Sequence, residues 1–172
     1  MFPRARMTDS SSTSDTKPGD LPASLDFGPL SERLGYALRR AQVAVFRDFF
    51  KAFEPFDLKP AQYSILTIIE LNPGLKQTQV ADALGIKRTN FVAMIDELEA
   101  RGFIRRDEAV GDRRSYALVL TPAGEALMPK LHATSAEHER RVIAALGPER
   151  HAEMALAMHE LVSQLEDGVA EE

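Results

Sequence analysis

Four consecutive polar residues, Lys87, Arg88, Thr89 and Asn90, carry side chains that can read the edges of DNA base pairs. Arginine can bond to both major-groove acceptors of guanine and asparagine to adenine, while lysine and threonine can bind a base or a phosphate. The four residues begin an amphipathic segment, and the first residues of a recognition helix point at base edges. They are therefore predicted to contact bases in the major groove.

A second group of polar residues begins the helix expected just before this one. Gln77, Thr78 and Gln79 combine polar side chains with the free backbone amides of a helix N-terminus. Such groups commonly hold a DNA phosphate without reading the base sequence. These three residues are predicted to fix the register of the protein on DNA.

A charged turn with two cations follows further along the chain. Asp112, Arg113, Arg114 and Ser115 belong to a turn expected at residues 110–115. Arginine on a flexible ribbon can enter a narrow minor groove, because the negative potential of that groove attracts it. The turn is predicted to bind DNA, with Asp112 orienting an arginine rather than touching the duplex.

The spacing of apolar residues predicts the elements that position these groups. Apolar residues at three- and four-residue steps indicate helices, and short runs rich in β-branched and aromatic residues indicate strands. The expected helices cover residues 31–54, 60–71, 77–84, 87–101, 122–146 and 148–166, and the expected strands cover 103–106 and 116–120. This order predicts a mainly α-helical, winged helix-turn-helix fold with a two- or three-stranded antiparallel wing.

Composition narrows the class of protein. The chain has 172 residues, 44% of them hydrophobic, a net charge of −5 and no cysteine. A negative protein does not coat nucleic acid indiscriminately, because that mode needs a broad positive field. The charge is uneven, however, since residues 101–114 hold five arginines against three acids, while residues 129–172 hold four basic residues against nine acids. A local basic surface that meets phosphate is therefore expected.

Both ends of the chain are expected to be tails. Residues 1–29 are rich in serine and threonine and too poor in apolar residues to fold, and residues 167–172 are acidic. No apolar run reaches the roughly 18 to 20 residues that cross a bilayer, and the N-terminus lacks the apolar core of a secretory signal. A cytoplasmic protein that does not contact membranes is expected.

Enzyme and metal sites are not expected. The sequence has no glycine-rich phosphate loop, nucleophile elbow or metal-ligand cluster, and Glu97 and Glu99 are expected on an ordinary exposed helix face. The four histidines are expected to face solvent, because their spacings do not match the four-residue step of a helical metal site. They are His132, His138, His151 and His159. No catalytic residue, cofactor or metal is predicted.

Four sequence motifs resemble the MarR family of winged-helix regulators. They are VADALGI at 80–86, IDELEARGFIRR at 95–106, GDRRS at 111–115 and LTPAG at 120–124. The Gly-Asp-Arg-Arg wing after a helix that ends in Arg-Gly is the most specific of these features. The resemblance extends over about residues 30–165.

The resemblance implies a homodimer that binds a pseudo-palindromic operator in double-stranded DNA and represses genes until a small effector binds. Its recognition helices would lie about 34–36 Å apart, and Arg114, with Arg113, would enter the minor groove. The lack of cysteine excludes the peroxide-sensing branch of the family. The implied domain covers residues 30–166, with a DNA-binding part at 56–121 and dimerisation helices at 30–54 and 122–166.

Effector pockets in this family lie between the dimerisation helices and the winged domain, which implicates six residues of this chain. Aromatic rings beside arginines would suit an aromatic acid or its coenzyme A thioester. Alternatively, the aromatic residues form core or dimer interface and the arginines are solvated. The six residues are Tyr36, Arg39, Arg40, Phe46, Phe50 and Tyr63.

Two other functions stay open at this point. A winged helix kept only as a protein-interaction module would need an exposed apolar patch and would leave the basic turn unused. A DNA-binding regulator without a small-molecule effector would use the same DNA-binding residues and no pocket. The basic turn favours DNA binding over the interaction module.

Overall fold

The structure is a computed structural model that describes the backbone of residues 25–109 and 112–169. Side chains are described for the same residues except 109, 112–115 and 166–169. The chain divides into two compact units, residues 1–38 and 39–172. Most of the tail predicted at residues 1–29 therefore lies outside the described residues.

The described part of the first unit consists of a short helical segment and the beginning of α1 (Leu34–Phe53). A 3-10 helix at Gly28–Glu32 comes first, so the predicted tail boundary at residue 29 falls inside an ordered turn. The rings of Phe27 and Tyr36 lie 5.7 Å apart. Helix α1 then continues into the second unit.

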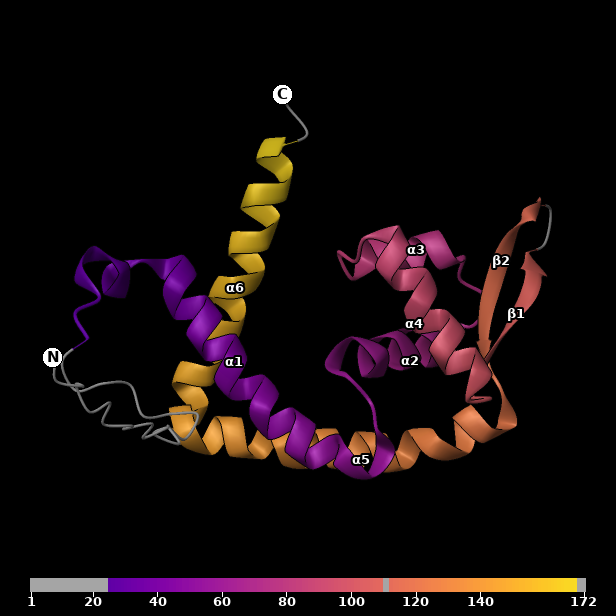
Figure 1. The fold of residues 1–172 in the computed structure, drawn as a ribbon, viewed down its shortest axis with the longest axis horizontal. Helices are drawn as coiled ribbons and strands as arrows, with labels where there is room; N and C mark the ends of the chain where they lie inside the picture. The colour runs from indigo at the N-terminus through magenta and orange to yellow at the C-terminus, as the bar shows by residue number, and fades with distance from the viewer. Residues whose placement is uncertain (1–24, 110–111, 170–172) are drawn as a thin grey trace, which may run out of the picture. The chain divides into compact units, whose positions relative to one another are not determined.

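The second unit carries the remaining helices and the sheet (Figure 1). After a 3-10 turn at Glu54–Phe56 come α2 (Pro60–Leu71), α3 (Gln77–Ala83), α4 (Arg88–Ala100), β1 (Ile104–Ala109), β2 (Asp112–Leu120), α5 (Pro122–Leu146) and α6 (Pro148–Val169). The described residues thus form six α-helices and a two-stranded sheet. This order confirms the predicted winged helix-turn-helix architecture.

The core of the second unit lies where α2, α3 and α4 meet the sheet and the first half of α5. Helices α2, α4 and α5 contribute apolar residues spaced three or four apart, as one buried helix face requires. The fully buried members include Ile65, Leu66 and Ile69 of α2, Val80 of α3, Phe91, Ile95 and Leu98 of α4, Leu118 of β2, and Met128 and Leu131 of α5. This core holds α4 in a fixed orientation.

The wing is longer than the sequence predicted. Its register runs from Ile104 opposite Leu120 to Glu108 opposite Tyr116, and an irregularity after Glu108 precedes the last pair. Residues 112–115, predicted to be turn, belong to β2 instead. Residues 112–115 form no apolar run that would indicate a strand, whereas backbone pairing needs no apolar side chains. Lys76 and Ala117 form an isolated bridge beside the wing, but the sheet of the described residues has two strands.

The start of α5 is fastened to the turn between α4 and β1. The Thr121 hydroxyl donates to the Gly102 carbonyl at 2.6 Å and accepts from the Gly124 amide at 3.1 Å. A Cβ on Gly124 would lie 2.1 Å from the Phe103 carbonyl oxygen, so only glycine fits at this contact. The LTPAG motif therefore joins the wing to the long helix.

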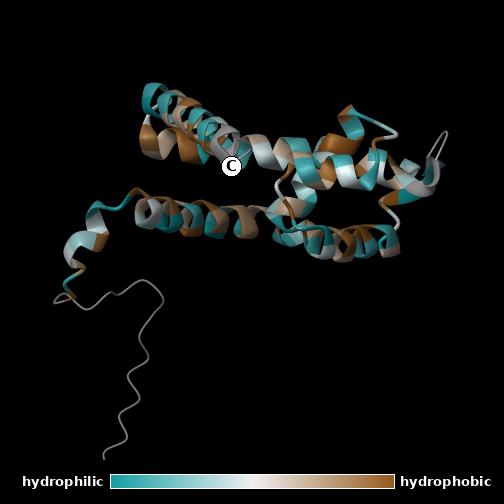
Figure 2. Ribbon diagram, turned by 90° about the horizontal axis from the view of Figure 1, so that it is seen from above, coloured by the Kyte–Doolittle hydropathy of each residue, from teal (hydrophilic) through white to brown (hydrophobic). Residues whose placement is uncertain are grey.

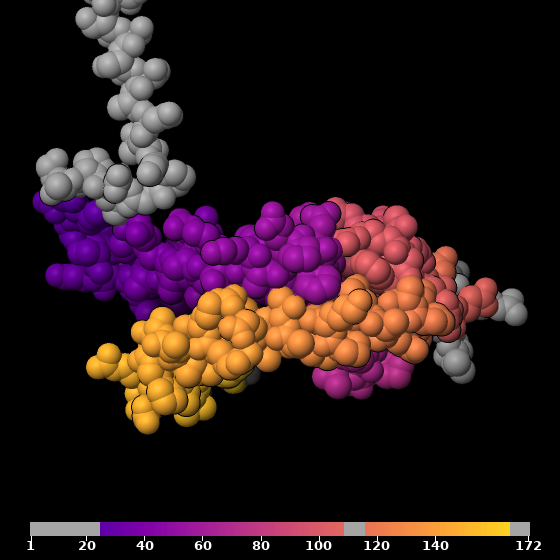
Figure 3. Space-filling view, turned by 90° about the horizontal axis from the view of Figure 1, so that it is seen from below, coloured from indigo at the N-terminus to yellow at the C-terminus, as the bar shows by residue number. Residues whose placement is uncertain are grey.

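The long helices α1, α5 and α6 carry recurring hydrophobic residues, which Figure 2 shows in brown. The second half of α1 lies along α5, as the violet and orange surfaces of Figure 3 show. Helix α6 continues to Val169, three residues into the predicted acidic tail, because no proline interrupts it there. The backbone of α6 therefore extends beyond residue 166, where the sequence predicted the helix to end.

Candidate nucleic-acid interface

The helix-turn-helix consists of α3, a tight turn and α4. Gly85 in this turn has φ +60°, a left-handed conformation that glycine adopts without a steric penalty. The Ile86 amide donates to the Ala81 carbonyl at 2.9 Å, which closes the end of α3. Because α4 begins directly afterwards and buries Phe91, its N-terminal residues point away from the core.

The four predicted base-reading residues lie together at this N-terminus. Lys87 is the N-cap of α4, Arg88, Thr89 and Asn90 form its first turn, and all four are exposed. Within the described part of the chain their side chains make no hydrogen bond or ion pair. They are free to bind a ligand without first breaking a contact inside the protein.

The three residues predicted to hold phosphate differ in their surroundings. Thr78 is exposed, and the Gln79 side-chain oxygen accepts from the Lys76 amide at 2.9 Å, which caps α3. Gln77 is half-buried, and its Nε2 atom is buried without a hydrogen-bond partner among the described residues. Gln79 thus has a structural task in addition to any contact with DNA.

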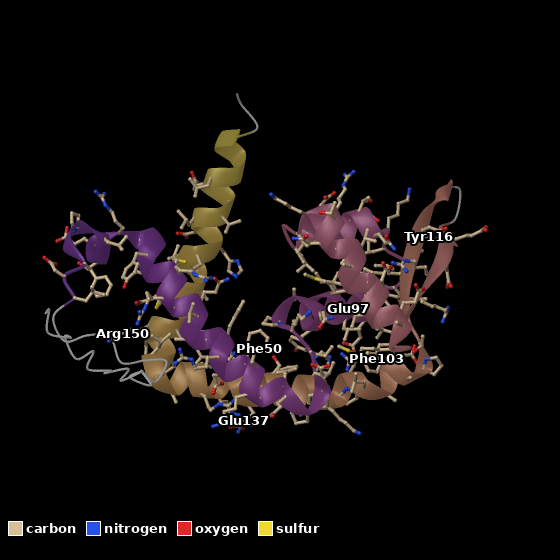
Figure 4. The ribbon with its side chains drawn as sticks, viewed as in Figure 1. Phe50, Glu97, Phe103, Tyr116, Glu137 and Arg150 are labelled. Carbon is tan, nitrogen blue, oxygen red and sulfur yellow. The ribbon has the colours of Figure 1, made fainter. Side chains whose placement is uncertain are left out.

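The predicted wing residues can be followed only as backbone. Asp112, Arg113, Arg114 and Ser115 lie in β2, but their side chains lie outside the described residues. Tyr116, the next residue, is 51% exposed and is labelled on the sheet in Figure 4. Tyr116 is not among the residues that the sequence predicts to bind DNA.

The basic stretch at residues 101–114 is less available to phosphate than its composition suggests. Arg101 donates to the backbone carbonyls of Asp57 and Phe56 at 2.7 and 2.6 Å. The Arg106 side chain is only 17% exposed and pairs with Asp96 and Glu99 of α4. Arg105 pairs with its neighbour Asp107 at 2.9 Å. Arg101 and Arg106 therefore contact other parts of the fold and not solvent alone, while the side chains of Arg113 and Arg114 lie outside the described residues.

The two acids that were expected on an exposed helix face do expose 50% and 37% of their side chains, and both also bond to other elements of the fold. Glu97 accepts a hydrogen bond of 2.7 Å from the buried Gln62 side chain of α2. Glu99 accepts from the Arg106 backbone amide at 3.1 Å as well as from its guanidinium. Both contacts join α4 to another element, α2 or β1, which the periodicity of a single helix does not reveal.

The predicted effector residues do not all lie together. Arg39, Phe46 and Phe50 line one groove of about 450 Å³ on α1, with Gln42, Val43 and Arg47. The Phe46 and Phe50 rings meet edge to face at 6.5 Å, and Figure 4 labels Phe50 on α1. The exposed Arg40 does not line this groove.

The two predicted tyrosines lie elsewhere. Tyr63 packs against the rings of Phe49 and Phe53 at 6.2 and 5.2 Å, and its hydroxyl lies 3.3 Å from His132. Tyr36 belongs to the first unit. Of the six predicted residues, the structure thus brings three to a common groove.

The expectation that all histidines face solvent is wrong. His138 is 6% exposed, and its Nδ1 lies 2.6 Å from Asp48 on α1. His132 bonds to Glu70 at 2.6 Å, and His151 pairs with Glu139. The acid partners lie on other helices or 12 residues away, so spacing along one helix does not indicate them. Among the described residues no group of three side chains is arranged to hold a metal ion.

Asp48 lies at the centre of the contact between α1 and α5. Arg141 donates to both of its carboxylate oxygens, at 3.0 and 2.9 Å, and His138 supplies another hydrogen bond. The hydrogen bonds from Arg141, and then that from His138, lower the pKa of Asp48 from 3.8 to about 2. The carboxylate is therefore ionised throughout the neutral range.

A sequence model of the MarR family matches residues 56–115, which cover α2 to the wing. A putative transcriptional regulatory protein for the hcr operon of Thauera aromatica is 39% identical over 103 residues. That alignment covers 59% of this chain and 62% of the relative, so the match spans less than two thirds of the relative's length.

Two solved structures of a transcriptional repressor, CouR, have the same fold. CouR bound to a 23-mer DNA duplex is 44% identical, with a TM-score of 0.74, and the match covers 82% of this chain and 99% of that one. CouR bound to p-coumaroyl-CoA is 41% identical, with a TM-score of 0.73 and coverage of 81% and 97%.

Among the described residues, every helix is too short or too polar to span a lipid bilayer. The family model and the relatives are those of transcriptional regulators and not of enzymes, in agreement with the prediction. The likeness to CouR spans nearly the whole of that protein at more than 40% identity. On this evidence, the chain belongs to the MarR family of winged helix-turn-helix transcriptional regulators.

Proposed function

We propose that this chain is a homodimeric transcriptional repressor that binds a pseudo-palindromic DNA operator and releases it when an aromatic acyl-coenzyme A thioester binds. The observation that carries the proposal is its likeness to CouR, which has been seen with a DNA duplex and with p-coumaroyl-CoA. An aromatic acid without coenzyme A is the simpler form of the same effector. Such a repressor would act in the cytoplasm, where the DNA lies.

The DNA-binding role rests on the exposed N-terminus of α4. Arg88 would pair with a guanine and Asn90 with an adenine, because their side chains match the major-groove edges of these bases. Thr78 and Lys87, both exposed, would hold phosphates. The wing would add Arg113 or Arg114 in the minor groove. This assignment is supported by the side chains at the start of α4, which make no hydrogen bond or ion pair within the described part of the chain.

The proposal of a homodimer is based on apolar surface that a single chain leaves exposed. Helix α6 exposes Met154, Leu156, Val162 and Leu165 by 44% to 63%. Exposed apolar residues gathered on one long helix are typical of a protein interface. A second copy would cover them and place two recognition helices about 34–36 Å apart on one face of DNA. Residues 30–54 and 122–166 would then be the dimerisation helices.

The effector site rests on the groove along α1. Phe46 and Phe50 offer rings for an aromatic acyl group, and Arg39 and Arg47 offer charge for the phosphates of coenzyme A. Tyr36, Arg40 and Tyr63 stay candidates for the same ligand. An effector releases DNA only if it binds the DNA-free form more tightly, by a coupling of typically 1–3 kcal/mol.

The test is a fluorescence-anisotropy titration of the full chain with DNA from upstream of its own gene and with a scrambled duplex, at several salt concentrations. The upstream DNA should bind at least about 10³-fold more tightly than the scrambled DNA. Addition of p-coumaroyl-CoA should release the upstream DNA from the protein, while coenzyme A alone should not. Equal binding to both duplexes would contradict the proposal of a sequence-specific repressor. Specific binding that no aromatic ligand weakens would contradict the proposal of an aromatic effector.

Two variants separate the parts of this proposal. Arg88→Ala should weaken binding to the upstream DNA by about 1–3 kcal/mol and leave binding to scrambled DNA almost unchanged. Phe50→Ala should leave DNA binding unchanged and weaken the response to the thioester. A variant that changes both activities equally would contradict the separation of the two sites.

A further inference from the structure

We infer that Val92, with Ala81 and Phe91, forms a hollow that takes the 5-methyl group of one thymine in each half of the operator. This inference rests on the proposed function, because it requires that α4 enter the major groove. It adds an apolar contact, and so a preference for T·A at one position, to the polar contacts assigned above.

The position of Val92 on α4 directs it toward the DNA. Val92 lies four residues after Arg88, so both side chains occupy the same face of the helix, one turn apart. Phe91, Ile95 and Leu98 bury the adjoining side of the helix in the core. Val92 is 44% exposed, although valine is among the residues most often buried in proteins. An exposed valine next to a base-reading arginine is in a position to contact an adjacent base pair.

The surface beside Val92 is a small hollow between α3 and α4. Its volume is about 100 Å³, and its walls are Gln77, Thr78, Ala81, Arg88, Phe91 and Val92. This volume is roughly three times the ~30 Å³ share of one water in the liquid, so a methyl group and its neighbouring atoms fit but a cofactor does not. The hollow lies between the predicted phosphate-binding and base-reading residues, where the edge of a base pair would come.

The lining of the hollow matches the chemistry of thymine. Ala81 and Phe91 are 1% exposed and give an apolar floor, while Gln77, Thr78 and Arg88 give a polar rim. In the major groove, thymine presents an apolar methyl beside the O4 acceptor, and no other base has this pair of groups. Thr78 and Arg88 are both exposed and supply donors at the same rim. The polar rim and apolar floor together favour thymine over cytosine.

The expected effect follows from the size of a methyl group. Burying one such group contributes about 0.8 kcal/mol, which is about a fourfold change in affinity. Because the proposed dimer binds two half-sites, loss of both thymine methyls should weaken binding by about 15-fold.

The experiment replaces each symmetric pair of operator thymines by deoxyuridine, which lacks only the methyl group, and measures Kd by fluorescence anisotropy. The affinity of the wild-type protein should fall about 15-fold when one particular pair of thymines is replaced. Val92→Ala should bind the thymine and deoxyuridine forms of that operator equally. Leu71→Ala, which truncates another exposed apolar residue of the same domain, should keep the wild-type sensitivity.

The outcomes separate this inference from the proposed function. If the protein binds the operator specifically but no thymine shows a methyl effect that disappears in Val92→Ala, the inference is overturned and the proposed repressor stands. Equal binding to operator and scrambled DNA would overturn both. Val92→Thr, which keeps the branched shape, serves as a second variant if Val92→Ala does not fold by circular dichroism. It should lower the methyl effect without abolishing it.

Discussion

The winged-helix part and the long helices differ in how they cover their apolar surface. In the winged-helix part, Ile65, Leu98 and Leu118 have no exposed area. In α6, no described side chain is buried, and Leu156 and Leu165 are more than 60% exposed. The DNA-binding part therefore completes its core within one chain, whereas the long helices need a further apolar surface, which the proposed dimer supplies.

The polar contacts differ in the same way. In the winged-helix part, Arg106 and Gln62 reach carboxylates on α4, so the wing and the recognition helix are held to one another. Along the long helices, the Asp48 cluster joins α1 to α5, and many other charged side chains stay exposed. This contrast predicts that substitutions of buried or paired side chains change the free energy of unfolding of one chain, and that substitutions on the exposed apolar face of α6 change assembly.

The largest effect is expected where the two regions join. Gly124→Ala would place a Cβ 2.1 Å from the Phe103 carbonyl oxygen, which is backbone and cannot turn away. The free energy of unfolding should fall by about 3 kcal/mol, measured by urea denaturation. Gly35→Ala is the matched control, because a Cβ there meets no atom within 4 Å and alanine favours the helix. Equal stability of the two variants would contradict this tight contact.

The next effect tests the need for a second chain. Leu165→Glu puts a charge on an exposed apolar position of α6, where one chain alone tolerates it. The dimer should dissociate at least about 30-fold more easily, or about 2 kcal/mol, by analytical ultracentrifugation at several concentrations. Gln164→Glu adds the same charge to the adjacent residue. An unchanged dimer in Leu165→Glu would remove this face of α6 from the interface.

A smaller effect is expected at the contact between α1 and α5. Asp48→Asn leaves the buried His138 without its carboxylate, and the free energy of unfolding should fall by about 1–2 kcal/mol at pH 7, discounted for the exposed edge of Asp48. Glu137→Gln, which removes an exposed carboxylate bonded to Arg141, should change the free energy of unfolding by less than about 0.5 kcal/mol.

The pH dependence of Asp48→Asn gives an independent check. The pKa of Asp48 is lowered from 3.8 to about 2, so the folded state binds this proton less readily than the unfolded state. Its stabilisation is fully present above about pH 4 and is lost as the pH falls through about 2. The difference between wild type and Asp48→Asn should therefore shrink over that window in thermal melts. A difference that stays constant to pH 2 would show that the carboxylate charge does not stabilise the fold.

The smallest effect concerns the clamp between the wing and α4. Arg106→Ala removes a side chain that is 17% exposed and pairs with two carboxylates, so the free energy of unfolding should fall by about 1 kcal/mol. Arg105→Ala, whose pair with Asp107 is about half exposed, should have almost no effect. If both variants have the same stability, Arg106 does not hold the wing.

Much of the DNA-binding part could be predicted from the sequence. The apolar spacing of Phe91, Ile95 and Leu98 indicated which face of α4 is buried, and Gly85 and Gly102 indicated where helices end. These signals are local, because a helix repeats every 3.6 residues and a left-handed residue favours glycine. The same periodicity brought Lys87 and Arg88 to the exposed start of the helix.

The errors share a physical cause. The burial of His138 depends on Asp48, ninety residues away in sequence, and the neutralisation of Arg106 depends on acids of α4 seven and ten residues away. The wing was predicted too short because its outer pairs form by backbone hydrogen bonds, which leave no apolar pattern. Contacts between separate elements are not encoded in the spacing along any one of them.

The sequence by itself determined the order of helices and strands, the family and the residues at the start of the recognition helix, since each depends on neighbouring residues or on a contiguous motif. Only the tertiary structure decided which arginines are free to meet DNA, which predicted effector residues share a groove and where apolar surface stays uncovered. Those properties depend on which side chains meet when distant segments pack, because a charge is neutralised, or a surface covered, only by the groups that come to lie against it.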